Sequence, residues 1–421
     1  MLPVISLLVL VAVILISAWK KVNPGLLGIV AAFILGFFVM QKTGAGVEIA
    51  LSSPAARARV LIAGFNYSLW FTIMAVSLFF AIANENRTME IITNKVITLI
   101  RGKNKLLPIV FYFLTFAIAA IGAGSIGVLI LIMPIAAAVA YEQKLDFLLI
   151  GVSIGLAAGA GGISPLAFTG IIATNLGALA GITVTSELFI RYFVCCTITV
   201  AILYVVLGGW KIKDAALDKI EMSRKMNTQQ LITLISILVF AVATVGFSLD
   251  VGFSAFTLSV LLFFLNKVDE KKVVAMIPWS TLILLCGMGI LINVVDKAGG
   301  MKLLTQFFMQ FVNKETAGPI INIVAGLMSF VASASGVVLP TLIPTVPGIA
   351  AATGASSSAL LNAISFGAHQ TAISPFSTGG SLILSMSGEN IDQQKTFWHL
   401  IISALCALAV GSVYSFLGML G

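Results

Sequence analysis

The chain has 421 residues, of which 59% are hydrophobic and 10% are charged. In a water-soluble domain about a quarter of the residues are charged, so the composition excludes a soluble enzyme and predicts a polytopic membrane protein embedded in a lipid bilayer. The formal net charge of +8 does not indicate a nucleic-acid partner, because basic residues in the loops of a membrane protein set its orientation.

Apolar runs in the first half of the chain predict plain spans at residues 2–18, 24–41, 63–83 and 187–209. Helices are expected because a bilayer offers no water to the backbone and because the alternation typical of a β-barrel is absent. Residues 84–105 place apolar side chains at helical spacing among Lys and Arg, which predicts an amphipathic helix in the membrane interface.

Two further apolar segments of the first half do not have the length of a simple span. Residues 106–141 are too long for one span and too short for two, so we expect a re-entrant hairpin with its tip at the Gly-Ala-Gly-Ser-Ile-Gly stretch, 122–127. Residues 145–181 contain Gly, Ser and Pro at 159–165. These residue types are the least suited to a continuous helix, so a broken helix is expected there.

The second half repeats this order after a polar connector at residues 211–228. At a fixed offset of 210, residues 125–170 share 11 of 46 identities with residues 335–380, including Ile-Ser-Pro in both broken helices, and such self-similarity indicates an internal repeat. The expected elements are spans at 229–246, 251–266 and 275–295, an amphipathic helix at 301–312, a hairpin at 317–352 interrupted at 333–336, a broken helix at 356–386 and a last span at 396–418.

Each half crosses the membrane an odd number of times, so the second half is expected to be inverted relative to the first. With both termini outside, the inner loops hold most of the 24 Lys and Arg residues, in agreement with the positive-inside rule. The connector is then cytoplasmic, and the expected location is the inner (plasma) membrane. The expected fold is an all-α polytopic membrane protein of two inverted repeats, each with three spans, a re-entrant hairpin, a broken helix and a last span.

The hairpin tips and helix breaks form the expected functional site. Interrupted helices free backbone groups that are tolerated at membrane depth where they line a cavity or meet a ligand. No charged residue falls in the middle of a predicted span, so helix N-termini and hydroxyls would hold an anionic substrate. The expected substrate-binding residues are Gly124, Ser125, Gly127, Ser164, Thr169, Ser333, Ser335, Gly336, His369, Thr371, Ser374, Ser377 and Thr378. The residues expected to bind a small cation are Ser125, Gly161, Ser164, Ser335, Thr371 and Ser374.

A packing role competes with each of these assignments. Small and hydroxyl residues are common where membrane helices pack closely, but the pairs Ser125/Ser335 and Ser164/Ser374 favour function because they recur at matching breaks. His369 is placed near mid-membrane, where a titratable side chain is a functional candidate. Hydrogen bonding to a carboxylate, proton coupling and burial as a satisfied imidazole are the roles that the sequence leaves open for it.

The segments at 122–134 and 333–344, each followed by an Ile-Ser-Pro break, resemble the ion transporter superfamily. Within it the chain most resembles the malonate/C4-dicarboxylate carrier branch, which is related to the divalent anion:sodium symporters. The resemblance covers essentially the whole chain, and it implies a homodimer in which a transport domain moves against a scaffold domain in an elevator fashion. The implied scaffold comprises residues 1–105 and 229–315, and the implied transport domain comprises residues 106–210 and 316–421.

One departure from the family pattern concerns both hairpin tips. In the sodium-coupled dicarboxylate relatives each tip carries Ser-Asn-Thr, whose side chains hold the substrate carboxylates. This chain keeps Ser125 and Ser335 but has Ile126 and Gly336 where the Asn would stand. The resemblance therefore supports the fold more strongly than it supports sodium coupling or the family's contacts to the carboxylates.

The expected function is secondary active transport of a small carboxylate, such as malonate or a C4 dicarboxylate, coupled to Na⁺ or H⁺. No cofactor or metal site is expected, because the four cysteines lie in apolar runs without metal-ligand spacing. The one ion that could bind is Na⁺, as a coupling ion. A sodium/proton antiporter is an alternative that the lack of a mid-membrane carboxylate disfavours. A more remote alternative is an intramembrane enzyme that uses Ser125 or Ser335 as a nucleophile and His369 as a base. The sequence shows no third group that would orient the histidine.

Overall fold

A computed structural model of the chain contains only helices as regular secondary structure over the residues that it describes. Seven described helices are long and apolar enough to cross a membrane, and shorter apolar helices accompany them. The expected all-α polytopic membrane fold is confirmed. The described residues are 1–20, 22–42, 54–99, 103–143, 145–184, 186–212, 226–330, 332–386 and 393–421.

The helices follow the order that the apolar runs predict. The first half contains α1 (Leu2–Lys20), α2 (Pro24–Lys42), α4 (Pro54–Ile62), α5 (Tyr67–Glu85), α6 (Thr88–Leu99), η1 (Asn104–Leu106), α7 (Leu107–Ile118), η2 (Ala119–Ala123), α8 (Ser125–Glu142), α9 (Phe147–Gly162), α10 (Phe168–Leu179), α11 (Ser186–Val206) and η3 (Gly209–Lys211). The second half contains α12 (Thr228–Ala241), η4 (Val242–Gly246), α13 (Val251–Leu265), α14 (Glu270–Ala275), α15 (Trp279–Lys297), α16 (Gly300–Met309), α17 (Ala317–Ser329), η5 (Ala334–Val338), α18 (Leu339–Leu342), η6 (Ile343–Thr345), α19 (Val346–Thr353), α20 (Ser357–Gln370), η7 (Thr371–Ile373), α21 (Thr378–Met386) and α22 (Gln393–Phe416).

The sequence does not predict the short helices α4 and α14. Helix α14 begins after Asp269, whose carboxylate accepts a hydrogen bond from the backbone N–H of Lys271 at 3.0 Å, an N-cap interaction that apolar runs do not reveal. Most of the expected connector, residues 213–225, lies outside the described residues.

Helix α9 continues through Gly159–Gly162, where the sequence predicts a break. A Cβ on Gly161 would lie 2.5 Å from the carbonyl oxygen of Phe116, and a Cβ on Gly162 would collide with Oγ of Ser125. Glycine is therefore required here because α7 and α8 pack against α9 too closely for a side chain. The chain leaves the helix only after these glycines, at Ile163.

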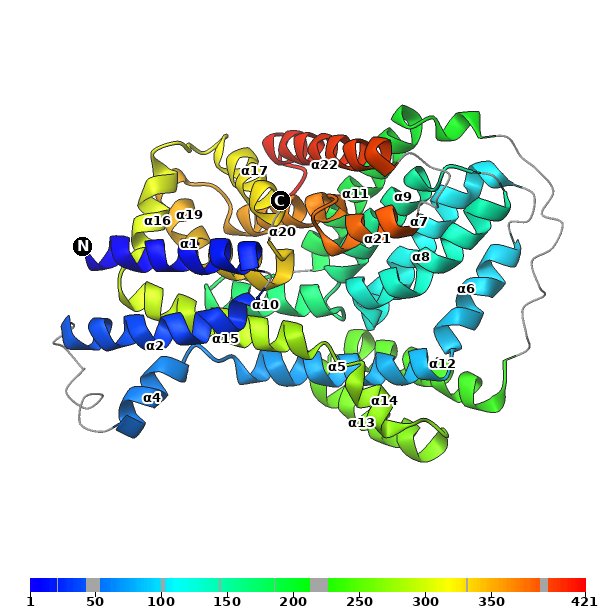
Figure 1. Ribbon diagram of the computed structural model, residues 1–421, viewed down its shortest axis with the longest axis horizontal. Helices are drawn as coiled ribbons and strands as arrows, with labels where there is room; N and C mark the ends of the chain where they lie inside the picture. Colours follow the sequence, from blue (N-terminus) through cyan, green and yellow to red (C-terminus); the bar gives the residue numbers. More distant parts are fainter. Residues whose placement is uncertain are drawn as a thin grey trace.

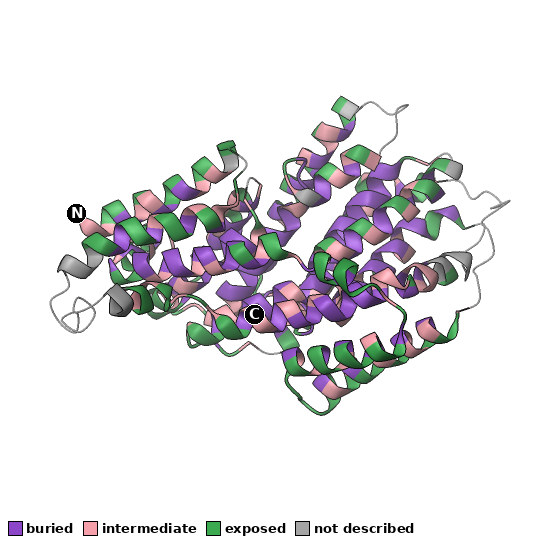
Figure 2. Ribbon diagram, turned by 60° about the horizontal axis from the view of Figure 1, so that its bottom comes forward, coloured by how far each residue is buried: buried purple, intermediate pink, exposed green. Residues whose placement is uncertain are grey.

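Every residue of α9 is buried, because α7, α8, α11, α20 and α21 all contact it. Figure 2 shows that buried residues run through the middle of the molecule and that rim helices carry many exposed ones. Exposed side chains include large apolar ones, such as Phe33, Leu238 and Phe264. Such a surface suits contact with lipid, since a bilayer is as apolar as these side chains.

The third long helix of each half, α5 and α15, lies beneath the hairpins and broken helices in the view of Figure 1. Helix α5 contacts η2 of the first hairpin and α10, while α15 contacts η5 and α18 of the second hairpin. On their other sides α5 packs against α13 and α15 packs against α2. Equivalent helices of the two halves thus support equivalent hairpins.

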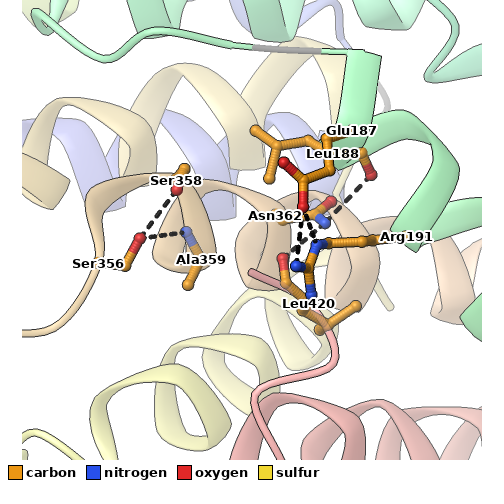
Figure 3. Close-up of polar contacts among 8 residues, drawn as sticks. All are labelled: Glu187, Leu188, Arg191, Ser356, Ser358, Ala359, Asn362 and Leu420. Carbon is orange, nitrogen blue, oxygen red and sulfur yellow. Dashed lines mark hydrogen bonds and ion pairs between the residues drawn. The ribbon is translucent and has the colours of Figure 1, made fainter.

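Buried Asn362 fixes the first arm of the second broken helix (Figure 3). Its Nδ2 donates to the carbonyl oxygen of Leu420 at 2.8 Å and to that of Leu188 at 3.3 Å, which ties α20 to the start of α11 and to the segment after α22. At the beginning of α20, Ser356 Oγ accepts a hydrogen bond from the N–H of Ala359 at 3.3 Å. These contacts hold α20 in the position from which it reaches the second break.

Candidate functional site

The first hairpin turns at two glycines. Helix α7 continues into the π-helical turn η2, in which Gly122 has φ +119°, and Gly124 then has φ +75°, both in the region that favours glycine. A Cβ on Gly122 would lie 2.6 Å from Cε2 of Phe80 on α5. The tip of the hairpin is thus pressed against α5.

Helix α8 begins at this tip without a capping side chain. Its first hydrogen bond runs from Val128 N to Gly124 O at 3.1 Å, and the N–H groups of Ser125, Ile126 and Gly127 have no acceptor among the described residues. Oγ of Ser125 is buried against Gly162 and likewise has no hydrogen-bond partner in the described part of the chain. Free N–H groups at a helix N-terminus carry partial positive charge and suit an anion.

The second hairpin has a different tip. Oγ of Ser333 accepts a hydrogen bond from the N–H of Gly336 at 3.2 Å. At the first tip, the N–H of the equivalent residue, Ile126, has no such acceptor among the described residues. Three prolines at 340, 344 and 347 divide its second arm into short helices, because proline lacks the N–H that continues a helix. Helix α8, with the single Pro134, remains one helix.

The two helix breaks share a pattern of backbone hydrogen bonds. In the first break, Ser164 N donates to Gly161 O at 3.0 Å and Ala167 N donates to Ser164 O at 2.9 Å. The same two bonds recur at 2.9 Å each between the residues 210 positions later, Thr371, Ser374 and Ser377.

A glycine follows each break for the same reason. A Cβ on Gly170 would collide with the carbonyl oxygen of Ser164, and a Cβ on Gly380 would collide with that of Ser374. The identities at these four positions therefore correspond to one local structure that occurs twice.

A cavity of about 570 Å³ lies where the tips and breaks meet, within the usual size of a small-molecule site. Among the described residues that line it there is no Asp, Glu, Lys or Arg. Both hairpins, both broken helices, α5 and the start of α15 contribute to the wall. The lining residues are Ser77, Phe80, Ala81, Asn84, Gly122, Ala123, Gly124, Ser125, Ile126, Gly127, Leu129, Ile130, Gly155, Ala158, Gly159, Phe168, Thr169, Met276, Pro278, Ser280, Thr281, Ser329, Ala332, Ser333, Ala334, Ser335, His369, Ala372, Phe376, Ser377 and Gly379.

The residues expected from the sequence divide into two groups. Those that line the cavity are Gly124, Ser125, Gly127, Thr169, Ser333, Ser335, His369 and Ser377. Those that do not are Gly161, Ser164, Gly336, Thr371 and Ser374. Thr378 begins α21, and its side chain lies outside the described residues.

The residues outside the cavity have packing partners. Oγ1 of Thr371 donates to Gly326 O at 3.0 Å, and Oγ of Ser374 donates to Phe330 O at 3.3 Å, so both hydroxyls face the first arm of the second hairpin. A Cβ on Gly336 would collide with the side chain of Leu284 on α15. The glycine that replaces the family's Asn therefore permits a close approach of the second hairpin to α15.

The sequence did not reveal the wall that α5 and α15 contribute. Ser77, Phe80 and Asn84 lie on α5, and Ser280 and Thr281 lie in the first turn of α15. The only sequence signal of the four polar residues among them is a hydroxyl or amide near or within an apolar run, which is equally typical of helix packing, and Phe80 gives no signal among the other apolar residues of α5. Phe168 and Phe376, each just after an Ile-Ser-Pro break, also line the cavity and could have been found from their position.

His369 is 5% exposed and lines the cavity near the end of α20. Its Nδ1 lies 2.7 Å from the carbonyl oxygen of Ser365. Because a carbonyl only accepts, Nδ1 carries the proton of this bond. Nε2 has no hydrogen-bond partner among the described residues, so it is the ring nitrogen available to a ligand.

Comparison with known proteins covers both halves of the chain. Residues 1–162 match the family model of the N-terminus of the dicarboxylate carrier protein MatC, and residues 220–419 match that of the Na⁺/H⁺ antiporter family. The predicted resemblance to a transporter superfamily is confirmed. No curated protein matches the chain.

A solved structure shares the fold. The YdaH transporter of Alcanivorax borkumensis, reported with an unusual topology, superposes with a TM-score of 0.60 at 14% sequence identity. The match covers 94% of this chain and 98% of that one. At this identity the likeness concerns the fold alone, so substrate and mechanism have to be argued from the cavity.

Proposed function

We propose that the protein is a secondary active transporter of a small carboxylate, such as malonate or a C4 dicarboxylate. The observation that carries this proposal is the cavity between two hairpin tips and two helix breaks, whose described wall is mainly apolar, includes hydroxyl and amide groups, and contains no Asp, Glu, Lys or Arg. At the first tip, the N–H groups that begin α8 have no acceptor among the described residues and are donors suited to a carboxylate. The match of residues 1–162 to a dicarboxylate carrier model supports the same substrate class.

Alternating access by an elevator movement is the mechanism that we propose. Residues 1–105 and 229–315 would form the scaffold, and residues 106–210 and 316–421 would form the moving part. The cavity has α5 and α15 on its scaffold side and hairpins and breaks on the other, so it lies at the boundary between these parts. Sliding along this boundary would open the cavity to each side in turn. A homodimer through the scaffold, in the inner membrane with both termini outside, belongs to the same proposal.

The coupling ion is proposed to be Na⁺ or H⁺. Of the six residues expected to bind a cation, Ser125 and Ser335 line the cavity, whereas the hydroxyls of Thr371 and Ser374 are bonded to backbone carbonyls. A Na⁺ site would therefore have to use the hairpin tips and backbone carbonyls. His369 is the titratable side chain on the described wall and is the corresponding candidate for H⁺.

Sodium/proton antiport is a second candidate because residues 220–419 match the Na⁺/H⁺ antiporter family model. Exchange of this kind generally uses a carboxylate that trades a proton for a cation, and the described wall of the cavity contains none. The same wall offers little to an intramembrane enzyme: Ser365 O orients the ring of His369 through Nδ1, but among the described residues no serine or threonine hydroxyl is hydrogen-bonded to Nε2 as a nucleophile would be.

Uptake into proteoliposomes tests the proposal. The purified protein should accumulate labelled malonate or succinate saturably when a Na⁺ or H⁺ gradient is imposed, and not without a gradient. Ser125→Ala should weaken uptake. Ser236→Ala on α12 is the control and should not, because Ser236 does not line the cavity and its Oγ donates to Ile232 O at 3.0 Å. Absence of uptake of any small carboxylate would remove this function, and gradient-driven Na⁺/H⁺ exchange in its place would establish the second candidate.

A further inference from the structure

Two parts of the cavity wall offer opposite hydrogen-bonding chemistry. At the first hairpin tip, the N–H groups of Ser125, Ile126 and Gly127 have no acceptor among the described residues and are free to donate, while Oγ of Ser125 lies against Gly162. At His369, Nδ1 is bonded to Ser365 O and only Nε2 is free. In a neutral ring whose Nδ1 carries the proton, Nε2 is an acceptor and cannot bind a carboxylate.

The neutral ring is the form that this environment supports. His369 is 5% exposed, and no Asp or Glu is among the described residues of the cavity wall. A second ring proton would place a positive charge in a buried site without a compensating carboxylate, which is costly.

Helix α9 packs against both of these parts. Oγ of Ser125 lies against Gly162, and Cβ of His369 is 3.3 Å from the position of a Cβ on Gly159. Residues three apart lie on the same face of a helix, with their Cβ positions roughly 5–6 Å from each other. Ser125 and His369 therefore contact positions about one helical turn apart on α9, so a short acid could reach both of them.

The second hairpin does not reproduce the anion-binding part. Ser333 already caps Gly336 N at 3.2 Å, and the position equivalent to His369 in the first half is Gly159, which has no side chain. The cavity is thus asymmetric although the backbone of the two breaks is alike. A ligand with two identical ionised ends would not match it.

Resting on the proposed carboxylate transport, we propose that the substrate binds with one carboxylate at the N-terminus of α8 and with a hydrogen-bond donor at its other end against Nε2 of His369. The substrate class is a short carboxylate that carries a hydroxyl, a primary amide or a protonated carboxyl group at the far end. The site selects for that donor, and the fully ionised dicarboxylate is not the bound form.

Competition against labelled malonate uptake in proteoliposomes tests this selection. The competitors share one carboxylate and differ at the far end: 3-hydroxypropionate and malonamate carry a donor, whereas propionate and monomethyl malonate carry none. The donor-bearing acids should compete about ten-fold better, the size expected for one hydrogen bond in a buried site. Equal competition by all four acids overturns the inference.

Variants locate the selection at His369. His369→Leu should abolish the preference, His369→Gln should retain part of it through its amide oxygen, and Ser125→Ala should weaken all four acids without changing their ratio. His399→Gln, on α22 outside the cavity, is the matched control and should behave as the wild type. A preference that persists in His369→Leu overturns the assignment; if that variant does not fold, His369→Gln and the wild-type series decide. Failure of the wild type to transport any carboxylate would instead count against the proposed function.

Discussion

Gly159 and His369 pack directly against each other, with Cβ of His369 3.3 Å from the place that a Cβ on Gly159 would occupy. The two residues are 210 positions apart and are therefore equivalent in the repeat. Contact between equivalent positions is expected where two related halves meet about an axis. The glycine of one half makes room for the imidazole of the other, so two breaks with the same backbone hydrogen bonds differ in the side chain that they present at this position.

Gly159→Ala should change transport more than stability. The new methyl group has to displace His369 by a few tenths of an ångström, which should raise KM for malonate several-fold. The free energy of unfolding should change by less than about 1 kcal/mol, since alanine's higher helix propensity offsets the crowding. Uptake kinetics and thermal unfolding in detergent measure the two effects. In a His369→Ala background the added methyl group should have little further effect on KM; an undiminished effect there would contradict this explanation.

Gly170→Ala and Gly380→Ala should both be strongly destabilising. Each Cβ would collide with a backbone carbonyl oxygen, of Ser164 and Ser374 respectively, and backbone cannot move aside as a flexible side chain can. We expect a loss of about 3 kcal/mol or failure to fold, measured as yield of monodisperse protein and melting temperature. Gly127→Ala is the control, because a Cβ there meets nothing within 4 Å. Normal stability of either break variant would show that the repeated local structure is wrong.

Asn362→Leu should destabilise the protein by about 2–3 kcal/mol, because the carbonyls of Leu188 and Leu420 lose their buried donor. Asn362 is 2% exposed, so water cannot readily replace it. Arg191→Ala nearby is the comparison. Arg191 forms a 2.8 Å ion pair with Glu187, and the two side chains are 38% and 67% exposed, respectively, so loss of this pair should cost less than about 1 kcal/mol. Chemical denaturation of both variants measures the difference, and equal losses would count against the role assigned to Asn362.

Thr371→Val should affect stability and leave substrate affinity unchanged. Oγ1 of fully buried Thr371 donates to Gly326 O at 3.0 Å, and it does not line the cavity. Loss of this bond should lower the free energy of unfolding by about 1 kcal/mol, and Thr371→Ser, which keeps the donor, should lose less. A changed KM for malonate in Thr371→Val, with normal stability, would show instead that Thr371 takes part in substrate binding.

Much of the framework could be predicted from the sequence because the bilayer leaves few alternatives. Long apolar runs have to form helices, and runs of intermediate length with Gly, Ser and Pro at their centre have to bend. The matching Ile-Ser-Pro motifs at 163–165 and 373–375 correspond to two breaks with the same hydrogen bonds. These features depend on the local amino-acid composition, which can be read directly from the sequence.

The position of the first break shows where this reasoning fails. Gly159–Gly162 looks like a helix breaker in isolation, yet it is helical because α7 and α8 require small residues on this face of α9. Tertiary packing outweighs the low helix propensity of glycine, about 1 kcal/mol per residue.

By itself, the sequence determined that this is a helical membrane protein, where its spans lie and that its interruptions occur twice at one offset, because hydrophobicity and backbone preference are local properties. The tertiary structure alone decided which hydroxyls face the cavity. Ser125 and Ser374 are both serines at interruptions, but Ser125 lines the cavity and Ser374 does not, because the hydroxyl of Ser374 is bonded to Phe330 O on the second hairpin. The direction of a side chain depends on the helices packed around it, and those neighbours come from distant parts of the chain.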